Sequence, residues 1–160
     1  MRKIKAKEIS AENFGLYGSF TDLLNPHGYC LGDFYPDRLL EPAKTTLPLA
    51  FSPLIVHKPK QMLIHVVEYH NYTGEIFLPL DTDVVIHVAP ASNVLVPEKT
   101  EAFIVRKGTI VRFNTGVYHY APFSIEKDEG RVLIVLPERT YMNDCCVFEY
   151  EEKDRMEIVL

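Results

Sequence analysis

The sequence predicts an all-β protein, an antiparallel sandwich or barrel with a short N-terminal helix and a loop-rich N-terminal segment. From residue 62 onward, short runs rich in Val, Ile, Phe and Tyr are separated by turn residues at a spacing of roughly ten residues. Nothing between these runs is long enough for the helix that a parallel crossover requires. The predicted strands are residues 62–70, 75–80, 84–89, 102–105, 109–114, 118–125 and 131–136.

The first predicted element is a helix over residues 10–17. Ser10 is a residue type that caps a first turn, and Phe14 and Tyr17 lie three positions apart, on one face of a helix. Gly18 follows, and glycine is the residue that most often ends a helix. The N-terminal end of the chain is therefore expected to fold as a short amphipathic helix.

The segment 20–59 is predicted to be rich in loops, because prolines and glycines interrupt every candidate element. Short extended pieces, notably residues 49–56, are expected within it, so that the segment wraps around the domain and supplies edge strands. At the other end of the chain, the acidic residues 149–157 are expected to form a final strand or a short helix with a solvated face. Residues 1–160 together have the size of a single domain.

Composition and charge exclude several classes of protein. A net charge of −5 argues against a nucleic-acid partner, because phosphate binding needs a clustered excess of Lys and Arg. No run approaches the roughly 20 apolar residues of a membrane helix. The basic start, residues 1–5, has no apolar stretch behind it, so it does not read as a signal peptide. We therefore expect a cytoplasmic protein that acts on a small molecule.

The three cysteines are Cys30, Cys145 and Cys146. An odd number that includes an adjacent pair is a poor basis for a disulfide framework, and reduced thiols are expected instead. Neighbouring cysteines can bind a soft metal, but no CxxC spacing supports such a site. Burial as small apolar side chains is the favoured interpretation.

A cluster of metal-ligating residue types lies around the turn at residues 71–74. Glu68 and His70 are two positions apart on a predicted strand, so their side chains share one face. Residues 71–74 read as a hairpin loop, which would place Glu75 directly opposite His70. Two carboxylates and one imidazole are therefore expected to converge on one face, which we take to be the inward one.

A second pattern, Gly108-x5-Asn114-x-Gly116-x2-His119, lies on the strands that follow. Together with Glu68-x-His70-x4-Glu75, it resembles the two motifs of the cupin superfamily. Those motifs are HxH followed by three or four residues and E, and G, five residues, PxG, two residues and H. In this chain Glu replaces the first His of the first motif, and Asn replaces the Pro of the second.

The cupin resemblance implies a jelly-roll β-barrel whose interior is lined by Glu68, His70, Glu75 and His119. Imidazoles combined with carboxylates suit a divalent metal, with Zn²⁺, Ni²⁺, Mn²⁺ and Fe²⁺ as candidates. Without a metal, carboxylates this close together would raise one another's pKa. His65 and His87 lie outside both motifs and are expected to be ordinary hydrogen-bonded core residues.

Within the cupins, the chain resembles the ureidoglycolate lyase family, formerly called hydrolases, of purine (allantoin) catabolism. The similarity begins with a helix that ends in Tyr17-Gly18. It continues through Glu68-Tyr-His70-x4-Glu75-Ile-Phe77-Leu-Pro79 and through residues 116–123. Two departures stand out: Glu75 occupies the position of a Gln in the family, and residues 33–38 replace a basic, His-containing segment that helps to bind substrate.

This resemblance implies cleavage of ureidoglycolate to glyoxylate and urea. The reaction needs a base for the hydroxyl proton and an acid for the departing nitrogen. Glu68 or Glu75 is expected to be the base, and His119 the acid or a metal ligand. Arg112 is expected to meet the substrate carboxylate, and Tyr118 to line the mouth of the pocket.

Two other functions remain open at this point. One is a different cupin enzyme, such as a sugar or keto-acid isomerase or an epimerase, which the altered residues 33–38 and Glu75 favour. The other is a non-catalytic cupin that binds a small metabolite or a metal. A homodimer is also expected, since edge strands often pair across a two-fold axis.

Overall fold

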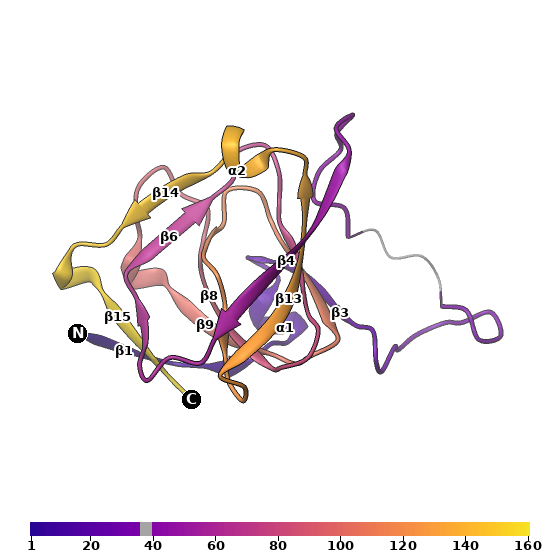
Figure 1. The fold of residues 1–160 in the computed structure, drawn as a ribbon, viewed down its shortest axis with the longest axis horizontal. Coiled ribbons are helices and arrows are strands. Elements are labelled where there is room, and N and C mark those ends of the chain that lie inside the picture. The colour runs from indigo at the N-terminus through magenta and orange to yellow at the C-terminus, as the bar shows by residue number, and fades with distance from the viewer. Residues whose placement is uncertain (36–39) are drawn as a thin grey trace.

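The computed structural model describes residues 1–35 and 40–160, with 45% of residues in strands and 9% in helices (Figure 1). The predicted all-β class is confirmed. The strands pair within three separate sheets, and among the described residues this pairing does not close a barrel. Residues 36–38, which belong to the segment 33–38 singled out above, lie outside the described residues.

The predicted N-terminal helix is present but shorter than residues 10–17. Helix α1 covers Ala11–Phe14, and Ser10 caps it: Oγ of Ser10 accepts from the Asn13 N–H at 3.3 Å, and Oδ1 of Asn13 accepts from the Ser10 N–H at 2.9 Å. The chain then turns, so that Tyr17 packs its ring 5.9 Å from that of Phe14. The next strand starts at Gly18 and continues to Asp22, within the first residues of the segment 20–59 that is predicted to be rich in loops.

One large sheet has five antiparallel strands. Its strands, in spatial order, are β3 (Gly18–Asp22), β10 (Thr109–Phe113), β7 (Ile76–Pro79), β13 (Glu129–Pro137) and β4 (Leu49–His57). Strand β4 pairs with β13 over its whole length, so the extended piece predicted at 49–56 is confirmed as an edge strand. Strand β3 replaces part of the predicted loop-rich segment.

The second large sheet has seven strands, and a three-stranded sheet accompanies it. The seven strands are β14 (Cys146–Glu149), β6 (Val66–Tyr69), β11 (Tyr118–His119), β8 (Val84–Ala89), β9 (Glu101–Val105) and β2 (Lys7–Glu8), with β12 (Phe123–Ser124) paired to β8. The smaller sheet consists of β1 (Arg2–Lys5), β15 (Met156–Val159) and β5 (Met62–Ile64). Its parallel β1–β15 pair brings the two ends of the chain together (Figure 1).

The side chains divide into two cores, one on each face of the seven-stranded sheet. Phe14, Phe77, Ile86 and Phe113 belong to the first core, which lies between the two large sheets. The second core lies on the opposite face, where Tyr118 packs with residues of the three-stranded sheet. Because successive strand residues point to opposite faces, the buried residues of strands such as β8 alternate between the two cores.

Two of the predicted strands are divided, and the acidic tail combines both of its predicted forms. The run 62–70 separates at His65 into β5 and β6, which belong to different sheets, and the run 118–125 separates into β11 and β12. In the tail, a 3₁₀ turn at Glu152–Asp154 precedes β15. The remaining helical pieces are a 3₁₀ turn at Pro97–Lys99 and α2 at Thr140–Asn143.

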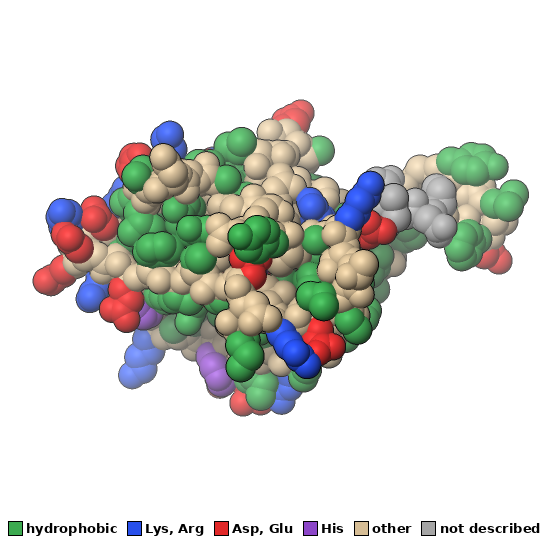
Figure 2. Space-filling view, turned by 90° about the horizontal axis from the view of Figure 1, so that it is seen from above, with side chains coloured by type: hydrophobic (Ala, Val, Ile, Leu, Met, Phe, Trp, Pro, Cys, Tyr) green, Lys and Arg blue, Asp and Glu red, His purple; other side chains and the backbone are tan. Residues whose placement is uncertain are grey.

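Apolar side chains are exposed on the segment that stands away from the body of the molecule (Figure 2). Tyr29, Leu31 and Phe34 are 75%, 74% and 67% exposed. Phe51 and Ile55, on the outer face of edge strand β4, are exposed as well. Within the described part of the chain, no helix has both the length and the apolar character that crossing a membrane would require.

Candidate metal centre

Three of the four predicted ligands lie on the inner face of the seven-stranded sheet. Glu68 is on β6, His70 directly follows that strand, and His119 is on β11, where it pairs directly with Glu68. The intervening Tyr69 and the neighbouring Tyr118 point the other way, into the second core. The predicted parity of Glu68 and His70 is therefore confirmed.

Glu75 reaches the cluster from the opposite sheet, so the predicted hairpin is wrong. Strand β6 pairs with β14 and β11, whereas β7, which follows Glu75, pairs with β10 and β13. Residues 71–74 thus carry the chain from one sheet to the other. Gly74 permits this close passage, because a Cβ there would lie 2.1 Å from the carbonyl oxygen of Phe113.

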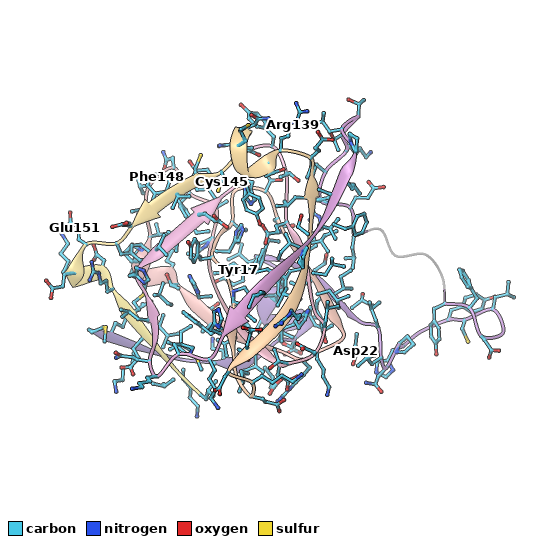
Figure 3. All side chains as sticks on the ribbon, viewed as in Figure 1. Tyr17, Asp22, Arg139, Cys145, Phe148 and Glu151 are labelled. Carbon is cyan, nitrogen blue, oxygen red and sulfur yellow. The ribbon has the colours of Figure 1, made fainter. Side chains whose placement is uncertain are left out.

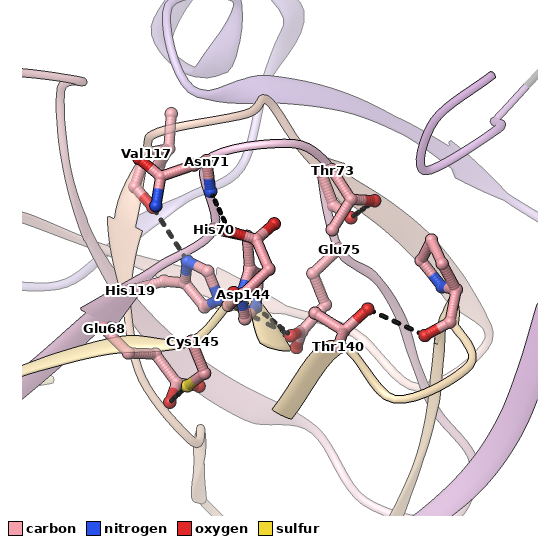
Figure 4. A network of polar contacts seen from close by, with 12 residues as sticks. Glu68, His70, Asn71, Thr73, Glu75, Val117, His119, Thr140, Asp144 and Cys145 are labelled. Atoms are coloured by element: carbon pink, nitrogen blue, oxygen red, sulfur yellow. Dashed lines mark hydrogen bonds and ion pairs between the residues drawn. The ribbon is translucent and has the colours of Figure 1, made fainter. Parts of the chain in front are cut away.

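The ligand atoms of Glu68, His70, Glu75 and His119 all lie within 4.8 Å of one another (Figure 4). Oε2 of Glu75 is 3.2 Å from Nε2 of His70 and 3.5 Å from Nε2 of His119. Atoms bound to one ion at about 2.0–2.2 Å lie about 3.0–3.5 Å apart in tetrahedral or octahedral geometry. The two distances from Oε2 of Glu75 fall in this range, and the four side chains together could hold a divalent metal.

Backbone carbonyls fix the orientation of both imidazoles. Nδ1 of His70 lies 2.6 Å from the carbonyl oxygen of Asp144, and Nδ1 of His119 lies 2.9 Å from that of Val117. A carbonyl oxygen only accepts, so each Nδ1 carries a proton and donates it. In the neutral rings, Nε2 then presents a lone pair toward Glu75, and Nε2 of the buried His119 has no hydrogen-bond partner. A cation would satisfy these atoms, and histidines that bind metals typically donate their other ring N–H to a carbonyl or carboxylate oxygen in this way.

The charges of Glu75 and His70 are coupled. Burial alone would raise the pKa of Glu75, but the His119 and His70 imidazoles beside it hold that pKa at about 2. Burial alone would lower the pKa of His70, but hydrogen bonds with Glu75 and with the Asp144 carbonyl raise it. The inner site thus favours an anionic carboxylate that is balanced by positive charge, which a proton or a metal ion can supply.

The segment that contains α2 covers the cluster. Besides its carbonyl contact with His70, Asp144 accepts the N–H groups of Asn71 and Tyr72 through its carboxylate, at 2.7 and 2.8 Å. The Cys145 thiol donates to Oε2 of Glu68 at 3.2 Å. Figure 3 shows Cys145 on this C-terminal segment, next to β6. The segment therefore positions two of the four candidate ligands.

A cavity of about 310 Å³ lies beside the cluster. Its walls include Ser52 and Ile134 from the two strands β4 and β13, together with Arg139 and Tyr141. The Tyr141 ring is 6.4 Å from that of His70. Although the side chain of Tyr141 is 57% exposed, burial of its hydroxyl and the nearby carboxylates of Glu75 and Glu68 raise its pKa. None of the four candidate ligands lines this cavity, so Tyr141 is the side chain that relates it to the cluster.

Two predicted substrate-binding residues lie away from the cluster. Arg112 is on the outer face of β10, where Nη1 donates to Oδ1 of Asn114 at 2.7 Å and Nε donates to the carbonyl oxygen of Glu41 at 2.6 Å. The Tyr118 hydroxyl donates to the carbonyl oxygen of Ser92 at 3.1 Å, on the far side of the sheet. Strand alternation thus directs both side chains away from the inner face.

Three further expectations need correction. His65 is exposed, so it is not a core residue. His87 is buried, but neither of its ring nitrogens has a hydrogen-bond partner. Cys145 and Cys146 are half-buried and take part in polar contacts, while Cys30 is exposed; all three are free thiols.

The residues missed at the sequence level are Arg139, Tyr141 and Asp144. The only signal in this part of the sequence is the neighbouring cysteine pair. Asp144 is 74 positions away from the histidine that it orients, and a backbone carbonyl leaves no trace in residue type. Tertiary placement of the C-terminal segment is needed to find these contacts.

The fold and the cluster define an all-β protein with a candidate divalent metal centre formed by two histidines and two glutamates. Residues 58–159 match the family described as Domain of unknown function (DUF4867), so the chain belongs to this family. The matched region contains all four candidate ligands. No curated protein sequence matches the chain.

Proposed function

We propose that this protein is a cupin-type metalloenzyme that cleaves ureidoglycolate, or a related small hydroxy acid, to glyoxylate and urea. The observation that carries the proposal is the approach of Oε2 of Glu75 to the Nε2 atoms of His70 and His119, at 3.2 and 3.5 Å. Both imidazoles are oriented through Nδ1, which leaves Nε2 available to a cation.

A jelly-roll architecture of the cupin type is supported by the two large sheets that enclose one core. The cupin-like motifs place their four candidate ligands on the inner faces of these sheets, three on one and Glu75 on the other. The donor set suits Zn²⁺, Ni²⁺, Mn²⁺ or Fe²⁺. A divalent ion, when bound, would polarise a hydroxyl or carboxylate oxygen of the substrate.

In the proposed reaction, the chain's own residues bind the substrate and move protons. His70, Glu75 and His119 would hold the metal, while Glu68, half-buried beside them, would accept the hydroxyl proton of the substrate. As the bond from carbon to the urea nitrogen breaks, a protonated group must donate to that nitrogen. The Tyr141 phenol, whose pKa is raised, stays protonated and lines the adjacent cavity.

The substrate carboxylate needs a cationic partner. Arg112 was expected to fill this role, but its guanidinium contacts Asn114 and Glu41 on the outer face. Arg139 lines the cavity beside the cluster, so we assign the carboxylate to Arg139 instead.

The test combines metal analysis with a urea-release assay on both enantiomers of ureidoglycolate. We expect a divalent metal near one equivalent in the wild type and its loss in His70→Ala. Urea release should also be lost in Glu68→Gln, while the exposed control Glu149→Gln should retain it. If metal is bound but neither enantiomer yields urea, the lyase function is rejected.

An isomerase or epimerase acting on a sugar or keto acid is the second candidate. It is favoured by two proton-carrying groups that lie close enough to interact, Glu68 and Tyr141, since moving a proton between carbons needs one group to remove it and another to return it. Exchange of solvent deuterium into a keto acid or sugar, without urea release, would select this function.

The expected homodimer stays a prediction. Exposed apolar side chains such as Phe51 and Ile55 on edge strand β4 support it, because edge strands and apolar patches favour association. Light scattering on the purified chain would measure the oligomeric state directly.

A further inference from the structure

His87 lies where strand β8 changes partners. Its neighbour Val88 pairs with His119 of β11, and Val85 pairs with Phe123 of β12. The residues between these two short strands, 120–122, form no strand. Among the described residues, strand β8 therefore has no strand partner on this edge at His87.

The imidazole of His87 is only 1% exposed, and neither ring nitrogen has a hydrogen-bond partner. In contrast, His70 and His119 each anchor Nδ1 on a backbone carbonyl. Burying a polar group without a partner is unfavourable, and native structures seldom leave one so. A partner that binds at this position would account for the two free nitrogens.

A cavity of about 220 Å³ opens onto this imidazole. Its walls are mostly apolar and include Leu63, Pro122 and Phe123, whose ring stacks on that of His87 at 6.2 Å. None of the four candidate metal ligands lines it, and among the described lining residues there is no Lys, Arg, Asp or Glu. The cavity is thus a separate site, larger than the roughly 150 Å³ that holds a benzene molecule.

We propose that this cavity, lined by His87, Leu63, Ala121, Pro122 and Phe123, binds a small uncharged aromatic alcohol of the phenol class. The apolar walls and the stacked Phe123 ring suit an aromatic ring, and the described lining, which also includes His57 and His65, holds no Lys, Arg, Asp or Glu to pair with an ion. Burial lowers the pKa of His87 to about 4, although the approach of the Val66 backbone, which does not meet hydrogen-bond geometry, opposes the shift. The ring is therefore neutral at pH 7, with one donor and one acceptor that a hydroxyl can match. This site is independent of the function proposed for the metal centre.

The test is a titration of the full chain with phenol, in which the ¹⁵N signals of the His87 ring report binding. We expect a saturable change with a dissociation constant on the order of 1 mM, as suits a ligand of this size. Toluene, which has the same shape but no hydroxyl, should bind at least about threefold more weakly, since it leaves His87 unpaired.

Two variants locate the ligand. His87→Phe and Ala121→Phe should each weaken phenol binding by at least about tenfold. The first change removes the polar partner of the hydroxyl. The second fills the cavity and keeps His87, so that its ¹⁵N signals can still be observed. His27→Phe, a matched change at an exposed histidine outside this cavity, should leave the affinity unchanged.

Three results would overturn the proposal. The first is an absence of any saturable change up to the solubility limit of phenol, which would leave water as the only occupant. The second is equal affinity for toluene and phenol. The third is binding that is lost in Glu75→Gln but kept in Ala121→Phe, which would place phenol at the metal centre.

Discussion

Oε2 of Glu75 lies 3.2 Å from Nε2 of His70, and the two residues come from different sheets. The candidate metal centre therefore bridges the two large sheets, with three ligands on one and a single carboxylate on the other. Any ion held there would link the sheets directly. Glu75 is thus the one candidate ligand through which such an ion would contact the second sheet.

Glu75→Gln should abolish most of the metal affinity. The change keeps the size of the side chain but removes the one negative charge that faces both imidazoles. We expect the dissociation constant to rise by about 100-fold or more, at least as much as the loss of an outer-shell partner typically causes. Competition with a chelator measures it. Glu149→Gln, an exposed change on β14, is the matched control, and similar losses in both variants would contradict the assignment.

Metal affinity should fall as the pH falls. Glu75 and the Asp144 carbonyl raise the pKa of His70, so below that pKa a metal must displace a proton from the ring. We expect the affinity to decrease by about tenfold per pH unit for each proton displaced, and to level off above the pKa of His70. Calorimetric or chelator titrations between pH 5.5 and 8.5 would measure the slope. A flat profile would contradict proton competition.

Metal removal should lower the stability of the whole fold, because an ion that binds only the folded state stabilises it by mass action. At a free concentration 100 times its dissociation constant, the gain is about 2.7 kcal/mol. We expect chelation to lower the midpoint of thermal unfolding in the wild type and to leave His70→Ala unaffected. An equal decrease in both would show that the chelator acts elsewhere.

Cys145 should react slowly with iodoacetamide. Burial and the neighbouring Glu68 carboxylate raise the pKa of its thiol from 9.0 to about 12, which lowers the thiolate fraction by about a thousandfold. A thiolate with a higher pKa is intrinsically more nucleophilic, which offsets about half of this effect on a logarithmic scale. We therefore expect Cys145 to be alkylated about 30-fold more slowly than a thiol of ordinary pKa. Mass spectrometry at pH 8 can compare it with the exposed Cys30, and Glu68→Gln should accelerate Cys145 alone.

Asp83 should stabilise the fold in a pH-dependent way. Burial alone would raise the pKa of Asp83, but hydrogen bonds from Arg106 and from the Lys107 N–H lower it. A carboxyl group whose pKa is lower in the folded than in the unfolded state stabilises the fold. This contribution is complete above the pKa of the unfolded state and is lost as the pH falls through the pKa of the folded state. Because Arg106 is largely exposed, we expect Asp83→Asn to lower the free energy of unfolding by only about 1–2 kcal/mol at pH 7.

Urea denaturation at several pH values tests this prediction. The difference between wild type and Asp83→Asn should stay constant from neutral pH down to about pH 5 and shrink below about pH 4. The exposed Asp128→Asn serves as the control and should change stability little at any pH. A difference in the free energy of unfolding that grows toward low pH would contradict the prediction.

Local sequence pattern was enough to predict much of the fold and the shared inner face of Glu68 and His70. The run 84–89 matches β8 in full, and alternation placed Glu68 and His70 on one face, because the two-residue period of a strand is a local property. The cap at Ser10 was likewise predicted from residue type. Helix α1 ended early because Tyr17 turns into the core, a tertiary effect.

The path of Glu75 could not be predicted in the same way. A four-residue turn between two apolar runs ordinarily joins paired strands, but here residues 71–74 lead to the other sheet. The deciding contacts, such as the passage of Gly74 past the Phe113 backbone, join residues that are far apart in sequence. The prediction for Arg112 was wrong for a simpler reason: its side chain lies on the outer face of β10, where it contacts Asn114.

The contact between the Asp144 carbonyl and His70 has a consequence for biosynthesis. During translation, the chain emerges from the ribosome with His70 long before Asp144, which follows it by 74 positions. The tautomer that points Nε2 toward Glu75 is therefore secured only when the C-terminal segment docks and β14 pairs with β6. Any metal that binds in the final geometry would therefore bind late, after the covering segment has been synthesised.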